Sequence, residues 1–350
     1  MDFTEKAQIS NDYFILQCTT IDTGSNMPQN IPVDATLLTD FHVSDENILK
    51  IIGSLNPNKA HGWDEISVRM IKVCDSALVV PLKITFMSCL RDGTFPNIWK
   101  RANVVPVHKK NEKNVKRNYR PISLLPIFGK ILEKLVYDSL YSHLISRDLL
   151  NPNQSGFSSG DSTVNRLISI THSIFKAFDC NPPLDVRSVY LDVSKAFDSV
   201  WHDGLIYKLK RCGVSGQLLS LLQSFLMDRK QRTVLNGQCS SWGDISAGVP
   251  QGSILGPLFF LVYINDLTEN LKCNVKLFAD DTSLFRVVEN SNAAANDMNH
   301  DLELIMQWAH DWRMSFNPDP LKQAVELIFS TKKIEVDHPV ILFNNVPVKK

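Results

Sequence analysis

The sequence has too little glycine and proline for a fibrous or low-complexity protein, with 15 and 17 of them among 350 residues. Its seven cysteines are odd in number, scattered and never spaced as CxxC. That spacing argues against a disulfide framework or a zinc ribbon and favours a reducing, intracellular setting. No unbroken apolar run reaches 18 residues, and the longest candidate, 254–264, is interrupted by Gly256 and Pro257. Since MDFTEKAQ carries an acid before any apolar segment, neither a secretory signal nor a membrane partner is expected.

Charge is balanced overall but unevenly distributed along the chain. The charges of the 37 basic and 37 acidic residues cancel. The 44% hydrophobic content is that of a globular protein, and 350 residues are enough for two or three lobes. Residues 1–50 contain eight acids and two lysines, whereas residues 100–120 contain eight basic residues and one acid. Because salt screens charge beyond about 8–10 Å, a phosphate backbone responds to such a local cluster. A solvated loop would have the same composition, so the cluster alone does not establish a nucleic-acid site.

Hydrophobic periodicity predicts a mixture of helices and strands. Residues 1–45 show weak periodicity and many Thr, Asn, Asp and Pro residues, which predicts a loosely structured leader. Helical patterns begin near Ser44 and recur at 128–144, 162–178, 203–211, 216–228, 257–266 and 298–312. Strand patterns cover 102–110, 187–193, 274–285, 324–330 and 340–343. Without regular βα alternation, this order predicts the α+β class.

Two of the predicted strands place carboxylates beside apolar residues. Asp192 ends one strand, and Asp280 and Asp281 lie between two others. Such acids lose hydration and, when adjacent, repel one another, so they need positive charge nearby. A hard divalent ion would supply it if the strand end at 192 lay beside the turn at 280–281, and three carboxylates can hold two metals about 3.5–4 Å apart. Aspartate also favours ordinary turns and caps, which leaves that alternative open.

The same acids lie within motifs that resemble the reverse transcriptases of non-LTR (LINE-type) retrotransposons, in particular the jockey-like branch. These motifs are YLDVSKAFDSVWH (190–202), GVPQGSILGPLFFLVYINDL (248–267) and FADDT (278–282), in this order and spacing. The segments NPNKAHGWDEIS, VVPVHKK, NYRPISLL and QSGFSSGDST resemble the fingers motifs of these enzymes. FNPDPLKQAVELIFS (316–330) resembles the motif that follows the catalytic hairpin. The resemblance covers about residues 45–345.

The resemblance implies a right-hand polymerase fold of fingers and palm within the α+β class. It divides the chain into a leader at 1–45, fingers at 46–186 and a palm with the metal-binding carboxylates at 187–345. Residues 346–350 would be the truncated start of the primer grip and thumb, so that the thumb is largely missing.

The resemblance also implies which residues hold metal. Asp192 and Asp281 would bind two Mg²⁺ ions, for which Mn²⁺ is a possible substitute. The backbone carbonyl of Val193 would complete one coordination sphere. Asp280 would lie near the primer terminus and belong to the same metal-binding set, so that the three aspartates are the implied catalytic residues.

Further residues match the family's nucleotide site. Phe197 corresponds to the steric gate, whose ring fills the space of a 2′-OH and thereby favours deoxynucleotides. Asp198, in the same AFD sequence, is expected to be structural. The loop containing Pro250, Gln251 and Gly252 would lie over the incoming nucleotide, because glycine allows a close backbone approach and the glutamine amide can bind the sugar or the template.

Basic residues complete the implied site. Arg120 matches the fingers arginine that stacks on the base and neutralises the triphosphate, and Lys109 or Lys110 matches the companion lysine. Lys322 lies near a late lysine that is proposed to protonate the departing pyrophosphate. One position departs from the family pattern: Ser158 stands where a basic residue usually follows the Gly-Phe of QSGF, which would weaken one contact of the fingers.

The implied reaction is attack by the 3′-OH of a primer on the α-phosphate of a deoxynucleoside triphosphate. Its partners would be an RNA template, a DNA primer and dNTPs, while the oligomeric state and the choice between nucleus and cytoplasm stay open. A different possibility is an inactive retroelement-derived fragment that binds RNA or has no function. The wording AFDSVWH and YINDL argues against a group II intron-type or retron-type enzyme. Another Mg²⁺ phosphotransferase would leave PQG and NYRP unexplained.

Overall fold

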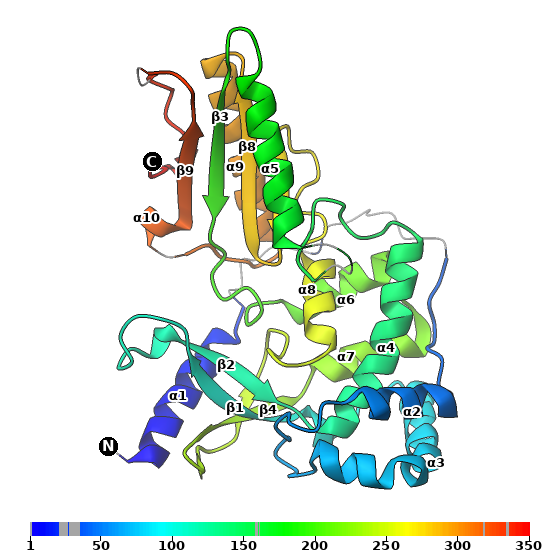
Figure 1. The fold of residues 1–350 in the computed structure, drawn as a ribbon. Helices are drawn as coiled ribbons and strands as arrows, with labels where there is room; N and C mark the ends of the chain where they lie inside the picture. The colour runs from blue at the N-terminus through cyan, green and yellow to red at the C-terminus, as the bar shows by residue number, and fades with distance from the viewer. Residues whose placement is uncertain are drawn as a thin grey trace. The chain divides into compact units, whose positions relative to one another are not determined.

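The computed structural model describes residues 2–20, 27, 36–157, 160, 162–317, 319–333 and 336–350 (Figure 1). Apart from residue 27, they form two compact units that the chain enters alternately. The first unit comprises the described residues of 2–20, 36–149 and 197–263, and the second comprises those of 150–196 and 264–350. Each unit has a sheet of its own.

The sheet of the first unit is built around β1 (Arg101–His108). This strand pairs antiparallel with β2 (Tyr119–Leu124) and parallel with β4 (Arg229–Leu235). The short strands β5 (Gln238–Cys239) and β6 (Gly243–Ile245) pair with β4. The β-branched, apolar sequence of β1 suits a pleated strand with one buried face.

Two helices of the first unit, α2 and α4, begin close to the positions that the sequence predicts, after a capping serine and a proline. Ser44 caps its helix by accepting a hydrogen bond from the amide of Asn47 at 3.1 Å, and Pro126 precedes the amphipathic segment predicted at 128–144. The helices of this unit are α1 (Phe3–Gln17), α2 (Asp45–Ser54), α3 (Val68–Asp92), α4 (Ile127–Ser146), α6 (His202–Arg211), α7 (Gly216–Leu226) and α8 (Leu255–Tyr263).

The sheet of the second unit is antiparallel throughout and carries the acidic motifs. Its strand order is β7 (Asn274–Phe278), β8 (Asp281–Val288), β3 (Asp185–Leu191) and β9 (Ala324–Phe329). The predicted strands at 187–193, 274–285 and 324–330 are therefore confirmed, with small shifts at their ends. Both acidic motifs lie at strand ends in this one sheet.

Two helices cover opposite faces of this second sheet (Figure 1). On one face, Phe285 packs in an apolar cluster with Ile170 of α5 (Thr163–Phe178). The next residue of β8, Arg286, forms an ion pair at 2.8 Å with Asp297 of α9 (Ser291–Asp311). Because successive side chains of a strand point to opposite faces, α5 and α9 enclose the sheet between them. The described part of the chain ends with α10 (Pro320–Gln323), β10 (Leu342–Phe343) and β11 (Val346–Pro347).

The prediction of a loosely structured leader is wrong for residues 3–17, which form α1. A capping box begins the helix, since the side chain of Asp2 accepts from the amide of Glu5 at 2.8 Å and the Glu5 side chain accepts from the Asp2 amide. Asn11 donates to the carbonyl of Ser241 at 3.1 Å. Polar contacts of this kind leave little hydrophobic periodicity to detect. Residues 21–26 and 28–35 of the predicted leader lie outside the described residues.

The helix α3 is long and apolar enough to cross a membrane, judged by length and composition alone. An 18-residue window in it has a mean hydropathy of 1.6, and 22% of that window is buried. Charged residues such as Lys83 interrupt the apolar sequence of this helix, so it contains no unbroken apolar run of that length. Core helices of soluble proteins pass the same test, and α3 places Ile71, Leu82 and Phe86 in the core. The predicted absence of a membrane partner stays a prediction.

Candidate active site

The pairing of β3 with β8 brings the two acidic motifs to one end of the second sheet. Leu191 pairs with Thr282, the last pair of this ladder. Asp192 directly follows Leu191 and Asp281 directly precedes Thr282, so both aspartates lie at the same end of this ladder. Paired residues of antiparallel strands have Cα atoms about 4.5–5.5 Å apart, and each aspartate is one residue beyond such a pair. Residues 89 positions apart in the sequence thus become neighbours, as a shared site requires.

The two acids also share a face of the sheet. Side chains alternate along a strand, so Asp192 lies on the side of Tyr190 and Asp281 on the side of Ser283. Tyr190 pairs with Ser283, which puts all four on the face covered by α5. Asp192 and Asp281 are exposed, whereas Asp280, in the turn, is half-buried. The carboxylates can therefore reach a ligand from solvent.

Asn317 holds the first of these acids, a role that the sequence did not reveal. Its Nδ2 donates to Oδ2 of Asp192 at 2.7 Å, and its backbone amide donates to the Asp192 carbonyl at 2.9 Å. The orientation of its side-chain amide is set from the other end, because Oδ1 accepts from the amide of Asp319 at 3.1 Å. Asn317 thus restrains both the backbone and the carboxylate of Asp192. Its place in FNPDPLKQ was the only available signal.

The segment that follows Asp192 is also fixed. Val193 forms an antiparallel bridge with Phe316. The two hydrogen bonds that flank this bridge use the carbonyl of Asp192 and the amide of Ser194, which donates to Ser315 at 2.8 Å. The carbonyl of Val193 is not part of this pair of bonds, so it is compatible with the ligand role that the resemblance implies.

Residues of the QSGF segment contact and hold the turn that contains Asp280 and Asp281. Gln154 binds both backbone groups of Ala279, accepting from its amide at 2.9 Å and donating to its carbonyl at 3.3 Å. Gly156 lies so close that a Cβ there would collide with the Ala279 amide nitrogen. Sequence reasoning assigned QSGF to the fingers, but the structure places it in the second unit, against the acidic hairpin. Ser158, where the family pattern departs, lies outside the described residues.

Among the residues that the structure describes, no group of three or more His, Cys, Asp or Glu side chains is arranged as a ready metal cluster. The donor chemistry at this end of the sheet nevertheless fits a hard divalent ion. Asp192 and Asp281 offer exposed carboxylate oxygens, and Val193 offers a backbone carbonyl. Oxygen ligands of this kind suit Mg²⁺ or Mn²⁺ rather than softer metals.

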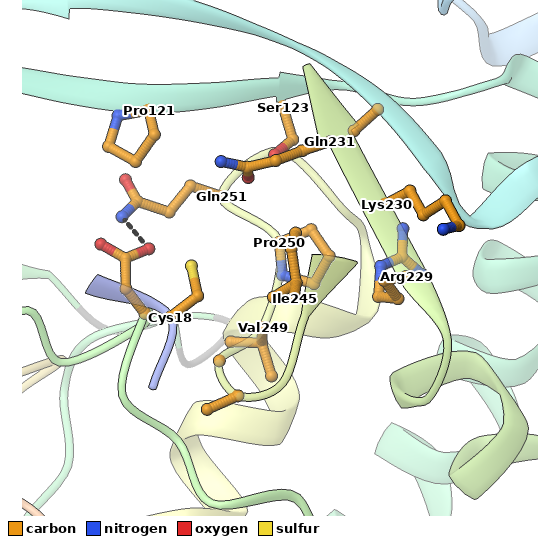
Figure 2. A pocket seen from close by; sticks show the side chains of 14 residues that line it. Cys18, Pro121, Ser123, Arg229, Lys230, Gln231, Ile245, Val249, Pro250 and Gln251 are labelled. Carbon is orange, nitrogen blue, oxygen red and sulfur yellow. Dashed lines mark hydrogen bonds between the residues drawn. The ribbon is translucent and has the colours of Figure 1, made fainter. Parts of the chain in front are cut away.

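In the first unit, the PQG loop packs closely against β2 and the AFD segment. The side-chain Nε2 of Gln251 donates to Oδ1 of Asp198 at 2.8 Å (Figure 2). The carbonyl of Gln251 accepts from the amide of Ser123 at 2.8 Å. Gly252 has a φ of 131°, and a Cβ there would collide with the Ser123 carbonyl oxygen. Only glycine fits this position without strain. Asp198, 6% exposed, thus orients the loop glutamine, in agreement with the structural role expected for it.

A pocket opens beside this loop, entirely within the first unit. It contains about 420 Å³ of space between atoms, including solvent-open volume, and Pro250, Gln251 and Asp198 line it (Figure 2). Gln231, which is 3% exposed, also lines it, and its Nε2 has no hydrogen-bond partner among the described residues. Phe197 lies half-buried in the same unit with its ring stacked on Phe260 at 4.7 Å. The loop residues therefore border a concave, partly polar space.

A buried acid supports the helix that follows the PQG loop. Glu133 of α4 accepts through Oε2 from the amides of Ile254 at 2.6 Å and Leu255 at 3.2 Å, at the start of α8. Burial raises the pKa of Glu133, and the hydrogen bond from Leu255 opposes the rise. Burial likewise lowers the pKa of Arg229 to about 10, while the charge of Glu133 opposes this shift. Glu133 therefore anchors the start of α8, and the only sign of this role in the sequence is an acid within an apolar helix.

The predicted phosphate-binding residues are exposed. Arg120 lies on β2 opposite Val107, and Lys109 and Lys110 follow β1 in the same unit. Lys322 belongs to the second unit, where its Nζ forms an ion pair with Asp319 at 2.7 Å. The residues of the predicted site thus belong to two units. The carboxylates and Lys322 are in the second unit, and the other residues predicted to bind the nucleotide are in the first.

Comparison with known proteins identifies the family of this chain. Residues 107–335 match the family described as reverse transcriptase (RNA-dependent DNA polymerase). The chain is 32% identical over 305 residues to the RNA-directed DNA polymerase from mobile element jockey of Drosophila melanogaster, an alignment that covers 84% of this chain and 32% of the relative.

Two further relatives from the same organism give similar values. Identity to the probable RNA-directed DNA polymerase from transposon BS is 32% over 286 residues, covering 78% of this chain and 31% of the relative. Identity to the probable RNA-directed DNA polymerase from transposon X-element is 30% over 311 residues, covering 86% of this chain and 33% of the relative. The chain spans about a third of the length of these relatives. Because the family match includes every residue of the predicted site, the chain belongs to the reverse transcriptase family, with similarity to the polymerases of jockey-type non-LTR retrotransposons.

Proposed function

We propose that this chain is an RNA-directed DNA polymerase that adds dNTPs to the 3′-OH of a primer during retrotransposition. The observation that carries the proposal is the pairing of β3 with β8, which brings Asp192 and Asp281 to the same exposed end of the sheet. Two neighbouring carboxylates from distant motifs have no evident structural use there, since like charges destabilise the sheet. They are useful if they share a cation.

In this proposal, Asp192, Asp281 and the carbonyl of Val193 hold two Mg²⁺ ions, with Mn²⁺ as a possible substitute. The ions would supply activation of the attacking hydroxyl and neutralisation of charge on the phosphate. Asp280 would lie near the primer terminus. Asn317 keeps the Asp192 carboxylate in one orientation through its 2.7 Å hydrogen bond, so less reorganisation is needed when the ligand binds.

The residues of the first unit would bind and select the nucleotide. Arg120 and the lysines at 109–110 would neutralise the triphosphate, and the ring of Phe197 would exclude a 2′-OH. Gln251, already oriented by Asp198, would present its remaining polar atoms to the sugar or the template. Lys322 would protonate the pyrophosphate. Phosphoryl transfer needs positioning and charge neutralisation above all, and these residue types supply both.

We further propose the right-hand arrangement of fingers and palm. The motif boundaries, fingers at 46–186 and palm at 187–345, follow the family resemblance. The compact units divide the chain differently, because residues 150–186 belong with the strands that carry the acids. The pairing of β10 with β11 is compatible with the start of a primer grip at 346–350.

The test is Mg²⁺-dependent extension of oligo(dT) on poly(rA). Asp281→Asn should abolish extension and leave the circular dichroism spectrum and melting temperature unchanged, because the side chain is exposed. Asp311→Asn is a control, since it removes one partly exposed carboxylate of the same unit from the end of α9. Extension by Asp281→Asn at the wild-type rate would show that Asp281 is not a metal ligand.

The alternative function is that of an inactive fragment that binds RNA. The chain spans about a third of the length of its relatives, and this alternative applies if the regions beyond that span are required to hold the primer and the template. Filter binding separates the two functions. Retention of primer–template without incorporation, in Mg²⁺ and dNTPs, would support the alternative.

A further inference from the structure

The hairpin turn before Asp281 is held by side chains that lie outside the hairpin itself. We propose that Gln154 and Arg166 are positioning residues that fix the Asp280–Asp281 turn in the geometry needed to bind metal. The inference rests on the proposed function for the role of the two acids. It assigns a positioning role to Gln154 and Arg166, which would neither contact substrate nor bind the ions.

The side chain of Gln154 forms three hydrogen bonds, two of them to Ala279 in the turn and one to Gly156. Its Oε1 accepts from the amides of Ala279 at 2.9 Å and Gly156 at 2.8 Å, and its Nε2 donates to the carbonyl of Ala279 at 3.3 Å. The side chain is 7% exposed, so these bonds are shielded from water. By binding both the amide and the carbonyl of Ala279, the buried amide of Gln154 restrains this residue in the same way as the hydrogen bonds of a neighbouring strand would.

The residue that Gln154 grips needs such support. Ala279 has a φ of 53°, in the left-handed region that costs a residue with a Cβ about 1–2 kcal/mol. Its left-handed conformation directs the chain into Asp280 and Asp281, which repel one another. The close approach of Gly156 on the same side leaves no space for the turn to relax toward the segment at 154–156.

Arg166 grips the hairpin from the α5 side. Its Nη2 donates to the carbonyl of Lys276 at 3.0 Å and to Oγ of Ser283 at 2.7 Å, and these two residues are a cross-strand pair of β7 and β8. Its Nη1 reaches the carbonyl of Asp281 at 3.5 Å. Burial lowers the pKa of Arg166 and the charge of Asp281 raises it, so the guanidinium and this carboxylate are within electrostatic reach. Arg166 thereby links both strands of the hairpin to α5.

The two contacts restrain different parts of the turn. Gln154 fixes the backbone just before the acids, and Arg166 fixes the strand pair just after them. Positioning of this kind affects the catalytic rate more than it affects the affinity for the nucleotide, since a misplacement of about 1 Å can cost 100-fold in catalysis. The residues proposed to bind the triphosphate lie in the first unit, so the KM for dNTP should be insensitive to either residue.

The experiment compares Gln154→Met, Arg166→Met and Arg166→Lys with the wild-type chain. Both methionine variants should lower kcat by about 10- to 100-fold, leave the KM for dNTP within about twofold, and raise the Mg²⁺ concentration for half-maximal rate. Arg166→Lys, which keeps the charge and can reach one of the acceptors, should recover a large part of kcat. Arg286→Met is the control, because it removes an arginine from β8 at the end of the hairpin remote from the turn.

Two measurements that do not depend on activity complete the test. Mn²⁺ affinity is measured by electron paramagnetic resonance, and hydrogen exchange is followed in peptides covering 276–284. The methionine variants should bind Mn²⁺ at least severalfold more weakly and exchange these amides faster, whereas Arg286→Met should do neither. Unchanged Mn²⁺ binding and exchange in both methionine variants would overturn the inference. Inactivity of the wild-type chain, with the Mn²⁺ and exchange differences present, would instead reject the proposed function.

Discussion

The ion pair between Arg187 and Glu326 gives a quantitative prediction about stability. Nε of Arg187 lies 2.6 Å from Oε1 of Glu326, and the two side chains are 0% and 1% exposed. Nη2 also donates to the carbonyl of Pro339 at 2.9 Å, while Nη1 has no hydrogen-bond partner within the described ranges. The pair joins β3 to β9 in the sheet that carries the acids. Glu326→Met would therefore leave a buried guanidinium with little compensation.

Removing one partner of a buried pair costs about 3–5 kcal/mol, because the remaining charge stays desolvated. That loss is a large share of the roughly 5–15 kcal/mol that stabilises a typical domain, and it changes the unfolding constant by about 100- to 4,000-fold. The double variant Arg187→Met/Glu326→Met removes both charges and should recover most of the loss, since an apolar pair of similar volume fills the same space.

The assay is equilibrium unfolding in urea, followed by tryptophan fluorescence and circular dichroism. Two tryptophans of the second unit, Trp308 and Trp312, report on its unfolding. We expect Glu326→Met to be far less stable than the double variant. A single variant within about 1 kcal/mol of wild type, or a double variant no more stable than the single one, would refute this account of the pair.

Three other changes test separate parts of the structure. Asn317→Ala should lower primer extension about tenfold with little loss of stability, because it frees an exposed Asp192 carboxylate, and an unchanged rate would exclude the positioning role. Glu133→Ala should cost about 2–4 kcal/mol in urea unfolding by leaving two amides of α8 without an acceptor, whereas Glu133→Gln keeps an acceptor and should cost less. Burial alone would raise the pKa of Asp185, but hydrogen bonds from Lys332 and Ser330 outweigh it and the pKa is lowered. Asp185 therefore stabilises the fold above about pH 4, and this stability is lost as pH falls through its folded pKa. The free energy of unfolding measured between pH 2 and 6 should accordingly depend less on pH in Lys332→Met.

The sequence predicts most elements of the second unit because its strands are short apolar runs bounded by polar residues. The strand that ends at Asp192 and the two strands around Asp280–Asp281 are recovered to within a few residues. Their pairing could not be derived from periodicity, since the register depends on contacts between segments far apart in the chain. Only the family resemblance gave a reason to bring the acids together.

The parts that the sequence missed depend on polar contacts. The helix α1 has weak periodicity and is held by a capping box and by Asn11, so its pattern was interpreted as a loose leader. Gln154 and Asn317 are ordinary polar residues in the printed sequence, and their tasks emerge only when distant backbone groups approach them. Side-chain-to-backbone bonds of this kind leave no periodic signal.

The two faces of β3 carry different tasks, and this arrangement has an evolutionary consequence. Arg187 forms the buried ion pair, whereas Tyr190 and Asp192, at positions of the opposite parity, face α5. Insertion of a single residue between 187 and 192 would invert the second set, so that the acid turned away from its counterpart on β8. Lengthening this strand by one residue should therefore abolish primer extension even though every aspartate of the motifs is retained, whereas a two-residue insertion would keep the parity and displace the acid along the strand.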